Sequence, residues 1–490
     1  MRVSGRVAGV WVVSALAGLA LVLHPDLYPR SWLMFGVVAL PGIVTVIAAL
    51  SEQLSPRKTM QYAISGLYTA LLVRIGPFLV IPYSGIDQVS LYEIVRKTLA
   101  SGKYAAPGGL YQSATQYPIG STVIAAVSGL HPPSLRFASL IVAATFPWLL
   151  AALVYKAGEG GRSAIFAGVL GSYFPLLVRT SALIEAEYMS LLYFLVVLYL
   201  LVLVLRAPTR RNVFLLMFML ATSVLVHFFY SLAIVGIITI SFVVHTVLSG
   251  QKRVNLRIVG ALLVGGTVIL TRILWSGYAE TTVGMAVGST VAAAKSSGGL
   301  LASFIPMSGT AASGAGTGGG QSLIMVVLKF VPLIVPLLLA AIGGLSMLRR
   351  KRSDPIVSVG IGVVVATIGL AVASGPSGKQ FRAYYFVGLL TIGFGGIGAS
   401  VLCNLGRWSA VRNIVAVGLI ILFSVTAVIG PAAPMGNDVD PQFGGTSFAI
   451  PQDPATINLI EEFRFLSRSC DPLRKKTIDT GGYAKCSPPD

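Results

Sequence analysis

The stretch that decides the fold is Tyr188–Leu205, YMSLLYFLVVLYLLVLVL, which carries no charged residue and no Pro or Gly. A helix that crosses a bilayer needs about 20 apolar residues to cover about 30 Å of hydrocarbon. Similar runs recur along the whole chain, whose mean hydropathy is +0.82 and whose hydrophobic fraction is 55%. These runs are continuously apolar and do not alternate, unlike the strands of a membrane β-barrel. The sequence therefore predicts an all-α polytopic membrane protein.

We expect about thirteen transmembrane helices. They are predicted at 7–23, 31–50, 60–82, 135–155, 163–178, 188–205, 212–228, 230–248, 258–275, 323–347, 355–374, 383–402 and 412–430. The two spans on either side of His227 also fit a single re-entrant unit.

The distribution of positive charge predicts the orientation. With the N-terminus in the cytoplasm, half of the 36 Lys and Arg fall in short cytoplasmic loops, as the positive-inside rule requires. The net charge of +19 is then mainly a topology signal, and anionic lipid headgroups are its natural counter-ions. Because this charge is spread over many loops, it does not indicate a nucleic-acid partner. We expect a cytoplasmic, plasma-type membrane, with the C-terminus outside.

The chain divides into a multi-pass membrane domain, 1–430, and a small extracytoplasmic tail, 431–490. Two external loops are long: 84–134, which is amphipathic and helical in pattern, and 276–322, which is rich in Gly and Ser and predicts flexibility. The cytoplasmic loops are all too short to contain a nucleotide-binding domain. Cys470 and Cys486 lie in the tail, where a disulfide is permitted but two free thiols fit equally well.

Carboxylates are scarce in this sequence, and none of the 17 Asp and Glu falls near the centre of a predicted span. Ion-coupled transporters usually place ionisable groups near the bilayer midplane, so this distribution argues against a proton- or cation-coupled carrier. A group of acids lies instead at the predicted outer rim: Asp26, Asp87, Glu93, Glu185, Glu187 and Glu280.

The rim acids predict a site at the outer interface. Asp87 follows its predicted span by a few residues, and His227 and Arg382 fall at the same level. A carboxylate at a partly dry interface can act as a general base, and an arginine can hold a phosphate through two parallel hydrogen bonds.

Each of these residues also has a simpler interpretation. Asp87 and Glu93 fit a helix cap or a surface charge, and His227 fits an interfacial histidine bound to a backbone carbonyl. Arg382 fits a cation that snorkels to the interface. Arg74, inside the third predicted span, is expected to snorkel outward or to pair with a rim acid.

The order of these motifs resembles the GT-C superfamily of multi-pass glycosyltransferases, which use sugars linked to polyprenyl phosphate. The resemblance rests on Gly85-Ile86-Asp87 after an early span, and on an amphipathic segment that ends in Ser101-Gly102-Lys103. It continues through Tyr117-Pro118-Ile119-Gly120, Ser128-Gly129-Leu130, the segment with Glu185 and Glu187, and Arg382 in a late external turn. Together these motifs cover roughly 60–400.

The resemblance implies a GT-C-like fold and an inverting transfer of a sugar on the external face. Asp87 would act as the base on the acceptor, and Arg382, with Lys379 and His227, would hold the lipid phosphate of the donor. Glu185 or Glu187 would supply a second acidic element, and a divalent cation there is left open. The alternatives are a transporter or flippase of lipid-linked substrates and a non-catalytic membrane assembly protein.

Overall fold

The computed structural model describes residues 5–23, 32–51, 53–78, 86–104, 116–129, 135–175, 177–178, 186–250, 256–275, 323–350, 353–374, 381–404 and 409–429. Within these ranges the elements are helices, and no β-strand is present. The external loop 276–322, the tail with Cys470 and Cys486, Lys379 and Glu185 lie outside the described residues.

The main bundle consists of helices that overlap the predicted spans. They are α1 (Gly5–Leu23), α2 (Trp32–Leu50), α3 (Pro56–Phe78), α7 (Leu135–Val154), α8 (Gly160–Tyr173), α10 (Ala186–Arg206), α11 (Arg210–Ser223), α12 (Phe228–Ser249), α13 (Leu256–Trp275), α17 (Leu323–Arg350), α18 (Pro355–Ser374), α19 (Phe381–Asn404) and α20 (Ser409–Ile429). A single π-helical turn, η2 (Tyr155–Glu159), joins α7 to α8.

Five of the described helices contain a segment long and apolar enough to cross a membrane, judged by length and composition. These segments are Leu140–Ala157, Met189–Arg206, Tyr230–Ser249, Val331–Arg350 and Tyr385–Cys403. They indicate a membrane-embedded protein, as the sequence predicts. The full number of thirteen spans stays a prediction.

Helices α8 and α11 end earlier than the sequence predicts. The residue after α8, Phe174, is extended, with φ −62° and ψ 115°, because the following Pro175 disfavours helical backbone before it. Helix α11 ends at Ser223 and a turn leads to His227, which is also extended and precedes α12. Each of these helices has 14 residues, or about 21 Å at the α-helical rise, which is less than the hydrocarbon thickness of about 30 Å.

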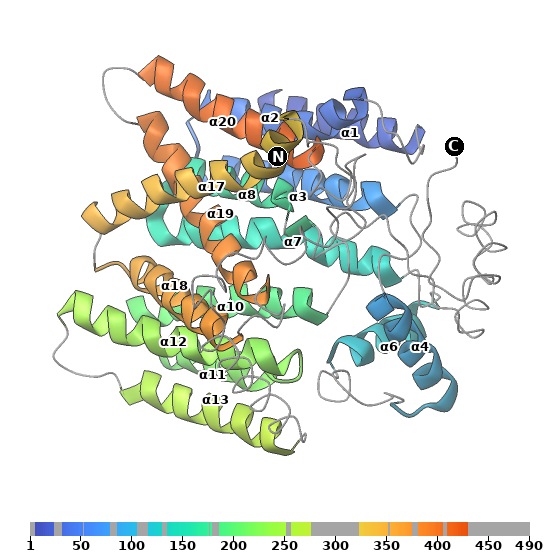
Figure 1. Ribbon diagram of the computed structural model, residues 1–490, viewed down its shortest axis with the longest axis vertical. Helices are drawn as coiled ribbons and strands as arrows, with labels where there is room; N and C mark the ends of the chain where they lie inside the picture. Colours follow the sequence, from blue (N-terminus) through green and yellow to red (C-terminus); the bar gives the residue numbers. More distant parts are fainter. Residues whose placement is uncertain are drawn as a thin grey trace.

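Helix α19 lies at the centre of the bundle and packs against α8, α17, α18 and α20. Figure 1 shows α1, α2 and α20 on one side of it and α11, α12 and α13 on the other. Its crossing with α17 is close: a Cβ added at Gly398 would lie 1.8 Å from the carbonyl oxygen of Leu339, and one added at Gly343 would lie 2.1 Å from that of Phe394. Small residues allow membrane helices to approach in this way.

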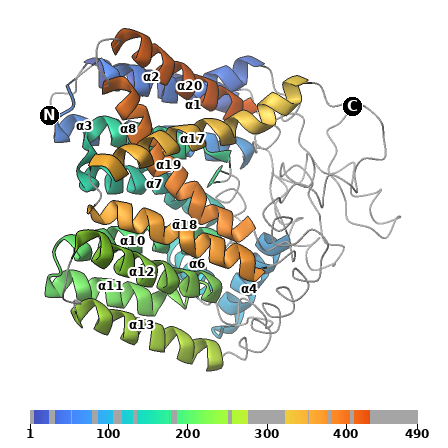
Figure 2. The same ribbon diagram turned by 60° about the vertical axis from the view of Figure 1, so that its left-hand side comes forward.

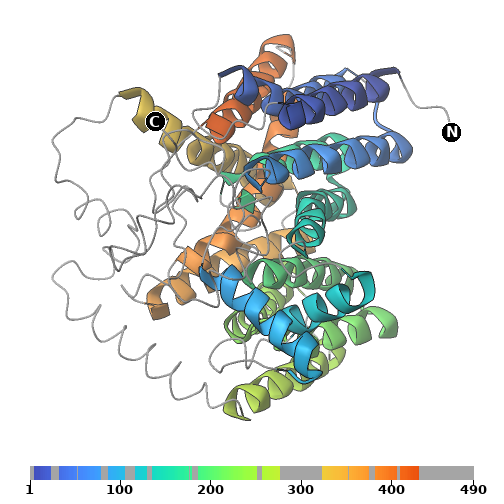
Figure 3. The ribbon, with the colours of Figure 1, turned by 90° about the vertical axis from the view of Figure 1, so that its right-hand side faces the viewer.

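Two helices of the predicted external loop stand apart from the main bundle. Helices α4 (Ile86–Ser101) and α6 (Gln116–Ser128) pack against each other, and α6 also contacts α7. The pair lies at one end of the bundle, opposite the end of α12 and the start of α13 (Figure 1). Figure 3 views the bundle from the side on which the pair lies. Helices are therefore present in the segment 84–134, and their amphipathic character and external position stay predictions.

At the opposite end of the bundle, arginines donate hydrogen bonds to carbonyls where neighbouring helices end. The last carbonyls of a helix lack partners within it, and a cation suits the negative end of the helix dipole. The pairs are Arg6 with Ser51 O, Arg162 with Leu50 O, Arg206 with Lys156 O and Ala157 O, and Arg257 with Pro208 O.

Candidate functional site

The predicted site residues that fall within the described helices lie at helix N-termini. Asp87 is the second residue of α4, Glu187 the second of α10 and Arg382 the second of α19, while His227 directly precedes α12. The structure gives the backbone position of Asp87, Glu187 and Arg382, and their side chains lie outside its described part.

An aromatic cluster joins the N-terminal halves of α10, α12 and α19. The Phe194 ring of α10 meets the Phe386 ring of α19 edge to face, with centroids 4.6 Å apart. Phe386 also lies 5.5 Å from the Tyr230 ring of α12, and the His227 ring meets Tyr230 edge to face at 5.0 Å. All four side chains are buried, and pairs of this geometry add to the stabilisation from burial alone.

The position of this cluster along the bundle determines where the charged residues Arg382 and Glu187, which precede it in α19 and α10, are located. At a rise of about 1.5 Å per residue, Arg382 lies about 6 Å beyond Phe386 and Glu187 about 10 Å beyond Phe194 along their helix axes. The backbones at Arg382 and Glu187 thus lie at the end of the bundle where His227 precedes α12. Helices α4 and α6 lie at the same end (Figure 2).

Within α4, Glu93 is occupied by neighbours on its own helix. Its carboxylate accepts from Arg96 at 3.0 Å and pairs with Lys97 at 3.2 Å. The hydrogen bond from Arg96, followed by that from Lys97, lowers the pKa of Glu93, although partial burial opposes the shift. Burial raises the pKa of Tyr104 at the end of this segment to about 12. These features agree with the simpler interpretation of Glu93 as a surface charge.

Arg74, which the sequence predicts to snorkel outward or to pair with a rim acid, binds backbone carbonyls. Its side chain is fully buried and donates from one nitrogen to the carbonyls of Ala70 at 3.0 Å and Ser172 at 3.1 Å. Ser172 lies in the last turn of α8, where carbonyls have lost their helical partners. The cation therefore lies inside the bundle at the break in α8, and its pairing with a rim acid stays a prediction.

The described residues contain no group of three or more His, Cys, Asp or Glu that could hold a metal ion. The predicted acidic pair is represented there only by the backbone of Glu187.

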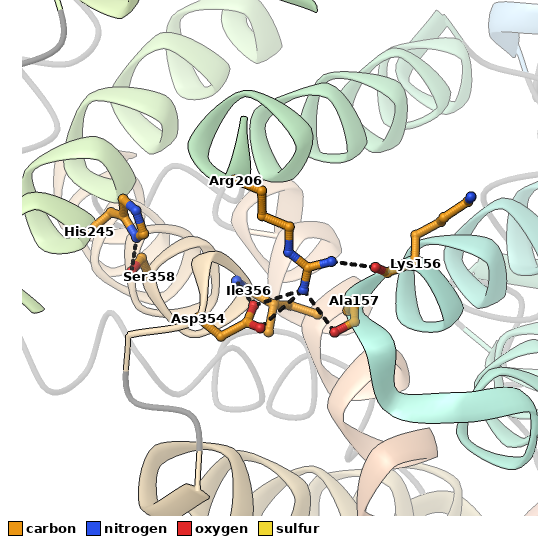
Figure 4. A network of polar contacts seen from close by, with 7 residues as sticks. All are labelled: Lys156, Ala157, Arg206, His245, Asp354, Ile356 and Ser358. Carbon is orange, nitrogen blue, oxygen red and sulfur yellow. Dashed lines mark hydrogen bonds and ion pairs between the residues drawn. The ribbon is translucent and has the colours of Figure 1, made fainter. Parts of the chain in front are cut away.

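A second polar cluster, which the sequence analysis does not predict, lies at the opposite end of the bundle (Figure 4). One nitrogen of Arg206 contacts both carboxylate oxygens of Asp354, at 3.2 and 3.0 Å, and also the carbonyl of Ala157. Asp354 in turn accepts from the backbone nitrogen of Ile356 at 3.0 Å and so caps α18. Nearby, His245 Nδ1 and Ser358 Oγ lie 3.4 Å apart.

This second cluster joins the π-helical turn, α10 and α18, and its residues serve mainly as structural links. Asp354-Pro355 is a recognisable helix-start signal, because Asp is a preferred cap and Pro is favoured at the first helical position. Its partner Arg206 lies 148 residues away, and nothing in the local sequence indicates that pairing.

Comparisons with known proteins add little to this geometry. No protein-family model matches the chain, and no curated protein matches it. Among solved structures, the chain is similar to the crystal structure of the oligosaccharyltransferase of Archaeoglobus fulgidus in the apo form, with 12% sequence identity and a TM-score of 0.49. That match covers 82% of this chain and 59% of the other, so the chain spans less than two thirds of that structure. A likeness of this strength does not assign the chain to a family.

Proposed function

We propose that the chain is a membrane glycosyltransferase that moves a sugar from a polyprenyl-phosphate donor to an acceptor hydroxyl. The reaction takes place at the end of the bundle where α4 and α6 lie. The observation that carries this proposal is the aromatic cluster Phe194, His227, Tyr230 and Phe386, which joins the N-terminal halves of α10, α12 and α19. Helix N-termini favour anions, and Arg382 adds a full positive charge at the same level.

In the proposed reaction, the acceptor oxygen attacks the anomeric carbon of the sugar while the bond from that carbon to the phosphate oxygen breaks. The configuration inverts, and polyprenyl phosphate leaves with the bonding electrons. Asp87 takes the proton from the acceptor hydroxyl, as a general base. Arg382, assisted by Lys379 and His227, stabilises the charge that develops on the departing phosphate.

The placement of Asp87 supports its role as the base. It begins a helix of the external pair, whereas Glu93, six residues later on the same helix, is bound to Arg96 and Lys97. Glu185 and Glu187 are proposed as the second acidic element, which orients the acceptor or shares a divalent cation.

The test is sugar transfer by the purified protein, reconstituted in lipid with a labelled polyprenyl-phosphate sugar and a panel of acceptors. Asp87→Asn is expected to lower the transfer rate by about 10²- to 10⁴-fold, the usual contribution of a general base. Glu93→Gln is the matched control, because it removes a carboxylate from the same helix, and its rate should stay near that of the unaltered protein. Equal rates for Asp87→Asn and the unaltered protein would refute the assigned role.

A flippase for lipid-linked substrates is the second candidate. It is favoured by the break after α8, because discontinuous membrane helices form the binding sites of many transporters. A flippase would move the labelled headgroup across the bilayer without forming a new glycosidic bond. The same reconstitution distinguishes the two functions, since only the transferase yields a labelled acceptor.

A further inference from the structure

The arginines at the end of the bundle opposite α4 and α6 fall into two classes. Arg6, Arg162 and Arg206 donate to backbone carbonyls of neighbouring helices. Arg210 and Arg211, at the start of α11, are exposed and form no hydrogen bond or ion pair with another described residue. Two positive charges are therefore still available to a ligand.

A third cation lies beside this pair. Helices α11 and α13 pack side by side (Figure 2), and exposed Arg257 of α13 donates to the carbonyl of Pro208 at 3.1 Å, two residues before Arg210. The described acids at this end are Asp354, which is ion-paired with Arg206, and Glu159. Arg210, Arg211 and Arg257 thus form a basic patch.

The face of α11 that begins at Arg210 is apolar and is largely exposed within the described part of the chain. Arg210, Phe214 and Phe218 follow each other at intervals of four residues and so share one face of α11. The two phenylalanines are 58% and 53% exposed, and Leu215 beside them is 39% exposed. At the helical rise, Phe214 and Phe218 lie about 6 and 12 Å from Arg210 along the axis.

We infer that this face of α11 binds a glycerophospholipid with an anionic headgroup. The headgroup phosphate contacts Arg210, Arg211 and Arg257, and the acyl chains lie against Phe214 and Phe218. The charge of the patch is complementary to the phosphate, and the apolar face continues in the direction that acyl chains take from a headgroup. A soluble phosphate would cover only the basic part of this surface and would leave Phe214 and Phe218 exposed, so the occupant is a lipid. It belongs to the leaflet at this end of the bundle, which is predicted to be the cytoplasmic leaflet.

The test uses the full-length protein in nanodiscs of phosphatidylcholine with a minor fraction of phosphatidylglycerol. The lipids that remain bound after extraction into detergent are counted by native mass spectrometry. The double variant Arg210→Gln/Arg211→Gln is expected to bind phosphatidylglycerol about 30-fold more weakly, since each interfacial arginine contributes about a factor of five to binding of an anionic lipid. Phosphatidylcholine retention should not change.

The matched control is Arg349→Gln/Arg350→Gln, which removes two exposed arginines from the end of α17 at the same end of the bundle. It should retain phosphatidylglycerol, and so should Arg210→Lys/Arg211→Lys, which keeps the charge. Phe214→Ala, which keeps every arginine, should lower retention of the diacyl lipid. Equal losses in the two Gln pairs, no loss in either, or full displacement of the lipid by inorganic phosphate would overturn the inference.

Discussion

The side chain of Tyr173 stabilises helix α2 at a position where a proline within α2 interrupts the backbone hydrogen bonds. Pro41 lies inside α2 and cannot donate a backbone hydrogen bond. The buried hydroxyl of Tyr173, on α8, accepts from Gly42 N at 3.1 Å and lies 2.8 Å from Val38 O and 3.2 Å from Ala39 O. In a membrane, side chains of neighbouring helices commonly satisfy groups that a proline exposes.

Tyr173→Phe is therefore expected to destabilise the protein by about 2 kcal/mol, because it leaves buried polar groups without a partner and creates no cavity. Thermal unfolding in detergent, followed by intrinsic fluorescence, measures the change. Tyr199→Phe is the control, since the Tyr199 hydroxyl forms no hydrogen bond with a described residue. A loss no greater than that of the control would contradict the role of the hydroxyl.

Individual residues also show where prediction from sequence reached its limit. The interpretation of Glu93 as a surface charge follows from the local spacing of Arg96 and Lys97, and the structure agrees with it. The position of Arg74 depends on Ser172, 98 residues away, and on a helix break that becomes visible only when α3 and α8 are packed together. A rule for isolated helices predicts snorkelling, whereas the fold supplies buried carbonyls.

At the scale of elements, the connection between α10 and α18 depends on one carboxylate with two tasks. Asp354 caps α18 through Ile356 N, and it holds Arg206, whose guanidinium also binds the end of the α7–η2 segment. Asp354 and Arg206 thus connect α10, α18 and the π-helical turn η2, which come from distant parts of the chain.

Two substitutions separate the tasks of Asp354. Asp354→Asn keeps an oxygen for the cap and loses the ion pair, whereas Asp354→Ala loses both, so the alanine variant should be less stable by about 1 kcal/mol more. Thermal midpoints are expected to fall in the order unaltered protein, Asn variant, Ala variant. Ser353→Ala, at the exposed neighbouring position, should leave the midpoint unchanged. Equal midpoints for the two Asp354 variants would show that the cap contributes nothing.

The helices themselves were predicted well from hydrophobicity, because continuous apolar runs are a strong local signal. Their ends were predicted less well. The break after α8 follows from Pro175, which is visible in the sequence. The turn between Ser223 and His227, in contrast, contains neither Gly nor Pro. No local breaker therefore marks the place where α11 stops.

At the scale of the whole molecule, the convergence of α10, α12 and α19 could not be predicted from sequence. Counting residues from the ends of the apolar runs predicts that four residues lie at the outer rim of the membrane domain: Asp87, Glu187, His227 and Arg382. The contacts among Phe194, Tyr230 and Phe386 join segments up to 192 residues apart, and hydrophobicity carries no information about such pairings.

The predicted topology can be checked with native and introduced cysteines. An odd number of crossings places Cys470 and Cys486 outside and Ser353 inside the cell. After reduction, a membrane-impermeant maleimide should label the two tail cysteines in intact cells, whereas Ser353→Cys should be labelled only after permeabilisation. Cys403 is buried in α19 and should react in neither case.

Omitting the reductant in the same experiment reports whether Cys470 and Cys486 are bridged, because a disulfide blocks both. Labelling of the tail that requires permeabilisation would contradict the odd number of crossings and the external tail.

The arginines bound to helix ends have a consequence for how the protein reaches its native state. Arg6, Arg162 and Arg206 count as positive charges while the chain is being inserted, when loop charge decides which side each segment faces. Their carbonyl partners belong to other helices, so these bonds form only after the helices have assembled. The same side chains therefore have two roles in succession: they first help to determine the membrane topology during biosynthesis, and they later form hydrogen bonds that stabilise the assembled bundle. Replacing one of them with a neutral residue would weaken the topology signal and also remove a hydrogen bond between helices. An experiment that measures only the final yield of folded protein would not distinguish these two effects.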